Sequence, residues 1–142
     1  MVFNGVTDTM AYAKILENQG LNHRRRSLDS LEFARHIVDV LDEHKAENIV
    51  LLDLRPDTVI ADFFILCTGT SDRQLKALVD HIKVGVKEAF ERRPFSEEGT
   101  ADSGWMLMDY GDVVVHMFLE DVRSYYDLEG LWNEANVLVS IQ

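Results

Sequence analysis

A β-hairpin over residues 105–119 is the clearest feature in the pattern of hydrophobic and polar positions. Two apolar runs, rich in residue types that suit a pleated strand, are separated by Gly111 and Asp112. Glycine accepts the positive φ that a two-residue hairpin turn requires, so this pair is predicted to form the turn. The register then sets Tyr110 opposite Val113 and follows outward along both strands.

Alternation along the hairpin gives it two faces of different character. One face is apolar throughout and is predicted to be core: Met106, Met108, Tyr110, Val113, Val115, Met117 and Leu119. The other face is mixed: Trp105, Leu107, Asp109, Val114, His116 and Phe118. A mixed face of this kind is either half covered by a helix, as most sheet faces in α/β domains are, or a docking surface for a partner. The pattern alone leaves both interpretations open.

A helix and two strands are predicted before the hairpin. The helix opens at Ser27 or Asp29, where an acid three residues further on completes the spacing of a capping box, and it ends at Asn48. Its inward positions recur at helical spacing: Phe33, Ile37, Val40, Leu41 and His44. The continuous apolar run 49–54 is typical of a strand with both faces buried, and a second strand is predicted over 59–68.

A longer amphipathic helix follows the second strand. Ser71 and Gln74 have the capping-box spacing, and apolar positions continue to Phe90, ahead of Pro94. An edge strand over 95–100 then precedes the hairpin. After the hairpin come two short helical segments, residues 121–126 and 128–135. This order of elements predicts an α/β (α+β) fold with a mixed sheet of about five strands flanked by helices.

The 142 residues are predicted to form one domain with a sizeable core. Residues 1–26 are expected to be a mobile extension with a short helix over 9–18, residues 27–135 the domain, and residues 136–142 a C-terminal tail. A single cysteine, Cys67, excludes an internal disulfide and fits a reducing compartment. No apolar run reaches the length of a membrane span and no signal peptide is recognisable, so a cytoplasmic protein is expected.

The net charge of −11 is unevenly distributed. Residues 1–26 carry four bases against two acids, which leaves −13 for the rest of the chain. From Glu97 onward there are ten acids and a single base, Arg123. Such a surface repels phosphate backbones and attracts a basic protein, so direct nucleic-acid binding by the hairpin is not expected. The alternative is that these acids form a solvated surface that keeps the protein soluble and binds no partner.

Three groups of residues are candidates for chemistry. Residues 69–71, at a strand-to-helix junction, could cradle a phosphate, but they lack a P-loop lysine and a helix cap explains them. Asp109 and Asp112 flank the hairpin turn and could share a cation, although turn formation accounts for both. His116 has no second ligand at a metal-binding spacing, and Cys67 has no obvious base. No catalytic residue, metal or cofactor is therefore expected.

Three motifs occur in one order along the chain: residues 62–71, the hairpin 105–118, and residues 123–132 with the sequence Arg-Ser-Tyr-Tyr-Asp-Leu-Glu-Gly-Leu-Trp. Together they resemble the ribosomal silencing factor family, also called Iojap, from about residue 27 to residue 134. The resemblance implies a mixed α/β sheet distantly like that of nucleotidyltransferases, without their active site. It also implies a bacterial or organellar translation repressor that binds the large ribosomal subunit, chiefly through large-subunit ribosomal protein fourteen, and blocks joining of the small subunit under nutrient limitation.

The resemblance also shifts the interpretation of the mixed hairpin face. The family's Trp-x-Leu/Val-x-Asp pattern falls on Trp105, Leu107 and Asp109, so this face becomes the expected docking surface. Further partner-binding candidates are Tyr110, Asp112, His116, Tyr126 and Glu129. The acid-rich half of the chain suits the same expectation, because ribosomal proteins are typically basic.

Two other functions remain open at this stage. One is a metal-dependent enzyme resembling nucleotidyltransferases, which would need closely set carboxylates beside a phosphate cradle. No Asp-x-Asp follows residues 69–71, so a non-enzymatic repressor is expected instead. The other is an assembly factor for the large subunit that uses the same surface. Whether two copies pair as a homodimer also stays open.

Overall fold

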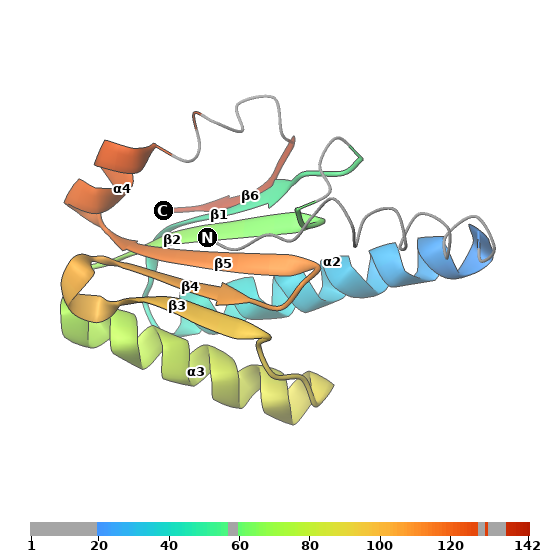
Figure 1. Ribbon diagram of the computed structural model, residues 1–142, viewed down its shortest axis with the longest axis horizontal. Coiled ribbons are helices and arrows are strands. Elements are labelled where there is room, and N and C mark those ends of the chain that lie inside the picture. The colour runs from blue at the N-terminus through green and yellow to red at the C-terminus, as the bar shows by residue number, and fades with distance from the viewer. Residues whose placement is uncertain (1–19, 57–59, 128–129, 131–135) are drawn as a thin grey trace.

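Six strands form one mixed sheet in the computed structural model, which describes residues 20–56, 60–127, 130 and 136–142. The strands are β1 (Glu47–Asp53), β2 (Phe63–Gly69), β3 (Ser96–Thr100), β4 (Trp105–Asp109), β5 (Val113–Leu119) and β6 (Asn136–Ile141). Their spatial order is β3-β4-β5-β2-β1-β6, and all neighbours are antiparallel except β2 and β5, which run parallel. The predicted α+β fold with a mixed sheet is confirmed, with six strands rather than about five (Figure 1).

The hairpin forms as the pattern predicts. β4 pairs with β5 in the expected register, in which Met108 faces Val115. Gly111 has a φ of 90°, and the Tyr110 N–H donates to the Val113 carbonyl across the turn at 2.9 Å. The register is set correctly because a slip of one residue would move the apolar side chains to the opposite face.

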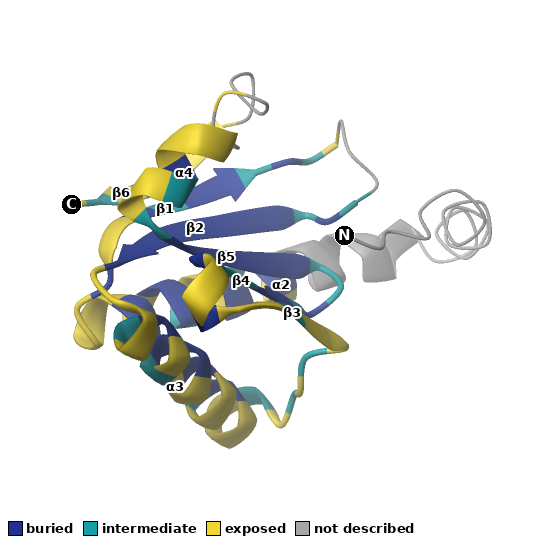
Figure 2. Cartoon of the chain, turned by 60° about the vertical axis from the view of Figure 1, so that its left-hand side comes forward, coloured by how far each residue is buried: buried dark blue, intermediate teal, exposed yellow. Residues whose placement is uncertain are grey.

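The apolar face of the hairpin lies under two long helices, α2 (Gly20–Glu43) and α3 (Asp72–Phe90). Its side chains join the main core as predicted: Met108, Tyr110, Val113, Val115 and Met117 are buried, and Met106 and Leu119 are half-buried against them. Figure 2 shows β2 and β5 as buried strands, and it shows the outer side of α3 as exposed. α2 and α3 therefore both pack on the same face of the sheet.

The start of α3 is fixed by the motif that sequence reasoning weighed as a phosphate cradle. The Ser71 Oγ accepts a hydrogen bond from the Gln74 N–H at 3.1 Å, and the Gln74 side chain accepts from the Thr70 N–H at 2.6 Å. The first bond satisfies one of the N–H donors that a helix start leaves unpaired, and the second ties the residue before the cap to the first turn of the helix. The helix-cap interpretation of residues 69–71 is confirmed.

The boundaries predicted for α2 are wrong at both ends. The helix begins at Gly20 and crosses residue 26, where the extension was expected to end. It stops at Glu43 rather than at Asn48, because Lys45 takes a left-handed φ of 65° and the Ala46 N–H donates to the Leu41 carbonyl at 3.0 Å. This Schellman-type ending normally uses glycine, so a lysine in its place gave no sequence signal.

The expected C-terminal tail, residues 136–142, is instead mostly strand β6, which pairs antiparallel with β1 at one edge of the sheet. Two short helices flank the hairpin at the end away from its turn. A 3-10 turn, Ala101–Ser103, precedes β4, and α4 (Glu120–Tyr126) follows β5. The latter confirms the short helical segment predicted over 121–126.

The helices predicted over 9–18 and 128–135 lie outside the described residues, apart from Gly130. The edge strand predicted over 95–100 is confirmed as β3. None of the described helices is both long enough and apolar enough to cross a membrane.

Candidate docking surface

A second, smaller apolar cluster lies on the sheet face opposite α2 and α3. Its buried members come from four strands and the loops beside them: Leu52, Leu54, Ala61, Phe64, Leu66, Leu107, Val114 and Phe118. Trp105 and Val122 are half-buried at its border. The mixed face of the hairpin therefore belongs to this cluster, and most of it does not face solvent.

Leu107 corrects the sequence-based expectation most directly. Its side chain is only 5% exposed, and it packs within the second cluster. The pattern placed Leu107 on the right face, but it could not show that this face is largely covered. Leu107 therefore supports the surface from beneath, and the expectation that it points outward is wrong.

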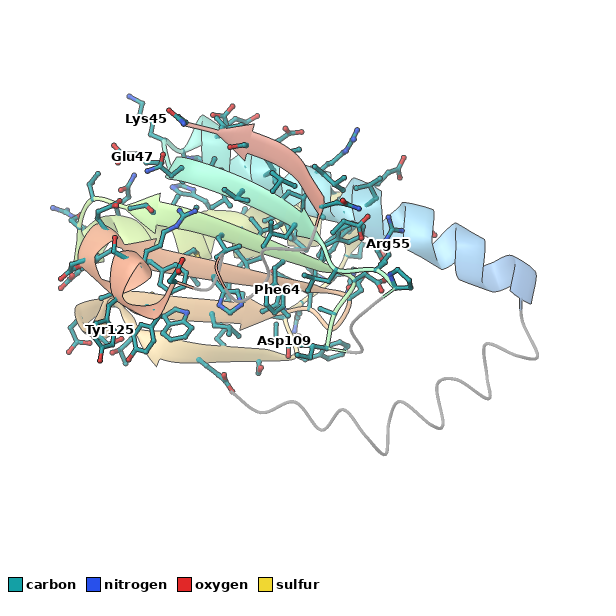
Figure 3. All side chains as sticks on the ribbon, turned by 90° about the horizontal axis from the view of Figure 1, so that it is seen from above. Lys45, Glu47, Arg55, Phe64, Asp109 and Tyr125 are labelled. Carbon is teal, nitrogen blue, oxygen red and sulfur yellow. The ribbon has the colours of Figure 1, made fainter. Side chains whose placement is uncertain are left out.

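Trp105 lies at the open end of the same face, within a row of aromatic rings. Its ring centroid is 5.1 Å from that of Phe118, which is buried, and 4.8 Å from that of Tyr126 on α4, which is 50% exposed. Figure 3 shows Tyr125, the residue before Tyr126, at this end of the sheet, whereas Asp109 lies toward the opposite end of the hairpin. Trp105 and Tyr126 are brought together as candidate contact residues, and Asp109 is kept apart from them.

His116 is held beneath Trp105. The Trp105 Nε1–H donates to His116 Nδ1 at 3.3 Å, so this ring nitrogen is the acceptor of a neutral imidazole. Burial lowers the pKa of His116 to about 4, and the side chain has no exposed surface. The expectation that His116 contacts the partner is therefore wrong: it orients the tryptophan ring from within the protein.

Asp109 and Asp112, the two acids beside the hairpin turn, make different hydrogen bonds. The Asp109 carboxylate accepts a hydrogen bond from the Gly111 N–H at 2.7 Å, which shapes the turn. The Asp112 carboxylate accepts from Arg92 and from Ser30 Oγ, each at 2.7 Å. Asp112 thus ties the hairpin tip to α2 and to the segment after α3. The turn interpretation is supported for Asp109 by its bond to the Gly111 N–H.

Tyr110 is another candidate that the structure places inside the protein. Its ring is fully buried and meets the edge of Phe33 with centroids 5.1 Å apart. Burial raises its pKa to about 12, so the phenol stays protonated. Tyr110 is core rather than a surface contact. Glu129, the last candidate, lies outside the described residues.

Arg123 is a residue whose role sequence reasoning missed. It is buried, and one guanidinium nitrogen donates to the Asn48 carbonyl at 2.7 Å and to Thr68 Oγ1 at 2.9 Å. These bonds attach α4 to β1 and β2, and so they set the position of Tyr126 against Trp105. The signal was present in the sequence, since Arg123 is the single base after Glu97.

Cys67 has no features of a nucleophile. Its thiol is buried in β2, and burial raises its pKa to about 12. A thiol with so high a pKa is not a reactive thiolate at neutral pH. Cys67 also lies in the main core, on the sheet face opposite to that of His116, so these two side chains do not pair as nucleophile and base.

Comparisons with known proteins agree on one family. Residues 27–142 match the family model described as "ribosomal silencing factor during starvation". A ribosomal silencing factor of Halalkalibacterium halodurans is 38% identical over 109 residues, which cover 76% of this chain and 92% of that protein. The Bacillus subtilis factor of the same name is 42% identical over 95 residues, covering 66% of this chain and 79% of that protein.

Organellar relatives and solved structures extend this pattern. A mouse protein named mitochondrial assembly of ribosomal large subunit protein 1 is 32% identical over 98 residues, which cover 68% of this chain and 43% of that protein. A crystal structure of a Chromobacterium violaceum protein superposes with a TM-score of 0.68 at 37% identity, covering 77% of this chain and 92% of the other. A Bacillus halodurans structure gives a TM-score of 0.64, covering 72% and 94%.

Proposed function

Because this chain belongs to the ribosomal silencing factor family, we propose that it binds the large ribosomal subunit and represses translation by blocking joining of the small subunit. The bacterial relatives are named as ribosomal silencing factors, and the mouse relative is named for assembly of the large subunit. The contact proposed on the subunit is large-subunit ribosomal protein fourteen, a basic protein. The site of action is the bacterial cytoplasm, when nutrients are scarce.

The observation that carries this proposal is the half-exposed aromatic row at one end of an acidic surface. Trp105 and Tyr126 offer broad, rigid rings that pack against each other, and Trp105 also packs against the second cluster. Little conformational entropy is therefore lost when a partner covers them. Glu120 and Asp121, next to the row, are exposed. Carboxylates at the rim steer a basic protein toward the surface and speed its arrival.

The proposed mechanism is exclusion rather than chemistry. A bound domain of this size occupies the face that the small subunit must approach, and no bond needs to be made or broken. Cys67 and His116, the side chains weighed earlier for reactivity, are buried with pKa values that keep them neutral. We therefore propose a non-enzymatic repressor that needs no cofactor.

Replacing Trp105 tests the docking surface. Trp105→Ala is expected to weaken co-sedimentation with separated large subunits by about 30-fold or more, the size of loss typical of a central aromatic contact. The measurement is a pelleting titration made well below the thermal midpoint of the variant, since Trp105 also packs on Phe118.

Leu107→Ala is the matched control for lost packing. Leu107 lies in the same cluster but is buried, so its replacement should cost about 2–5 kcal/mol of stability and leave affinity for the subunit nearly unchanged. Equal losses of binding in the two variants would mean that Trp105 makes no contact of its own. Wild-type protein that fails to pellet would overturn the proposed function altogether.

A second candidate function, a factor for assembly of the large subunit, is favoured by the name of the mouse relative. The same surface would serve both functions. A translation assay with preassembled subunits separates them: silencing lowers the yield of protein in that assay, whereas an assembly factor leaves it unchanged.

A further inference from the structure

An exposed tyrosine on α4 extends the aromatic row beyond Trp105. Tyr125 is 81% exposed, and its ring meets that of Tyr126 edge-on with centroids 5.0 Å apart. Tyr126 lies against Trp105, and Trp105 lies against the buried Phe118. Exposure therefore increases along the row from the sheet to α4. The Tyr125 ring, the outermost of the row, contacts Tyr126 while most of its surface remains in solvent.

Three exposed acids, Glu120, Asp121 and Asp127, lie on or next to α4, which carries this ring. Asp121 precedes Tyr125 by one helical turn, so both exposed side chains share one side of the helix. On the adjacent side, Glu120 and Asp127 line a pocket of about 340 Å³ between α4, β1 and β6. Arg123, the basic residue of α4, is buried and donates hydrogen bonds to acceptors on the sheet. The solvent side of α4 is thus aromatic and acidic.

We propose that α4 is a second part of the docking surface, where an arginine or lysine side chain of the basic partner stacks on Tyr125 and pairs with Asp121. The inference rests on the proposed function, which supplies the basic partner. A cation over an aromatic face is attracted by the negative face of the ring, and a nearby carboxylate adds to that attraction. None of the sequence motifs had assigned a role to Tyr125, Glu120 or Asp121.

Charge selects this partner over two others. A phosphate backbone would meet the exposed Glu120, Asp121 and Asp127 and be repelled. A second copy of the chain would bring the same acids opposite one another across a two-fold axis, which is also unfavourable. A cationic side chain is the one class that gains from both the ring and the carboxylates.

Pelleting titrations of the full chain with purified large subunits test the inference. Tyr125→Ala is expected to weaken binding about 3- to 30-fold, which corresponds to the usual range for a cation on an aromatic face. Tyr125→Phe retains the ring and should bind like the wild type. The matched control is Phe95→Ala, because Phe95 is 80% exposed but lies beside the hairpin turn, away from α4; its binding should be unchanged.

Asp121→Asn tests the sign of the charge on the partner. Affinity should fall and become less sensitive to salt, since one attractive charge is removed. Stronger binding by this variant would mean that α4 meets phosphate, and it would overturn the inference. Wild-type affinity in Tyr125→Ala would also overturn it while leaving the proposed function intact, provided that Trp105→Ala still loses binding. Wild-type protein that does not pellet would overturn both.

Discussion

His116 shows how burial decides what a single residue can do. The sequence placed it correctly, opposite Leu107 and on the mixed face of the hairpin. Its burial could not be predicted, because alternation tells which side chains share a face and not how far that face is covered. Covered by the second cluster and bonded to Trp105, the imidazole is a neutral support for the aromatic row.

Neutral burial of His116 predicts a loss of stability in mild acid. Its pKa is about 4 in the folded protein and near 6.5 when unfolded, so as pH falls below 6.5 the unfolded chain takes up the proton first. Unfolding becomes easier down to about pH 4 and is unaffected by this group at lower pH. At pH 5 the expected loss is about 2 kcal/mol relative to pH 7.

Urea denaturation of wild type and His116→Gln at pH 7 and pH 5 measures this loss. Other titrating groups are common to both proteins, so the difference between their two pH dependences isolates His116. Identical pH dependences would show that the imidazole is not held neutral by the fold.

At the scale of elements, α4 depends on one side chain for its place on the sheet. Arg123 bonds to acceptors in both β1 and β2. Arg123→Ala is expected to lower the free energy of unfolding by about 2–4 kcal/mol, since it removes charged hydrogen bonds and takes this donor from the buried Thr68 hydroxyl. Arg35→Ala, which replaces an exposed arginine on α2, should change stability by less than about 0.5 kcal/mol.

Arg123→Lys refines this prediction. Lysine keeps the charge but lacks the planar fork of the guanidinium, so it should recover part of the stability. Chemical denaturation gives the free energies of the three variants. Arg123→Ala as stable as Arg35→Ala would show that α4 is held by its apolar contacts alone.

The elements that sequence reasoning predicted well are those in which local signals and packing agree. α3 combines a Ser71 cap with a buried face of five apolar side chains at helical spacing, and the hairpin combines a Gly111 turn with side chains that alternate between two faces. α2 was mispredicted where this agreement failed. Its last turn is closed by Lys45 in a left-handed conformation, which local propensity disfavours and tertiary packing imposes.

Across the whole molecule, the two faces of the sheet differ in what covers them. α2 and α3 pack on one face, whereas the other carries the smaller cluster and α4 at one end (Figure 1). Sequence reasoning predicted the family, the mixed sheet and the acidic half. It did not separate Trp105, which is half-buried at the border, from Leu107, which is sealed. That distinction depends on β1 and β2, which complete the cluster and lie far from the hairpin in the sequence.

The C-terminal strand gives a prediction for the molecule as a whole. Deleting residues 136–142 should lower the free energy of unfolding by at least about 2 kcal/mol, because β6 covers one edge of β1 and its Val139 and Ile141 pack against the core. Removal of a mobile tail would have no such effect. The measurement is thermal and urea denaturation of the shortened chain, and an unchanged midpoint would contradict the prediction.

The single cysteine has a practical consequence. Cys67 lies in β2, between β1 and β5, and its thiol is sealed from solvent. A maleimide in the surrounding buffer can reach it only when the middle of the sheet comes apart. The rate of alkylation therefore reports the opening of the protein's interior, without any engineered label and in the presence of ribosomes, whose own thiols are resolved from it by mass.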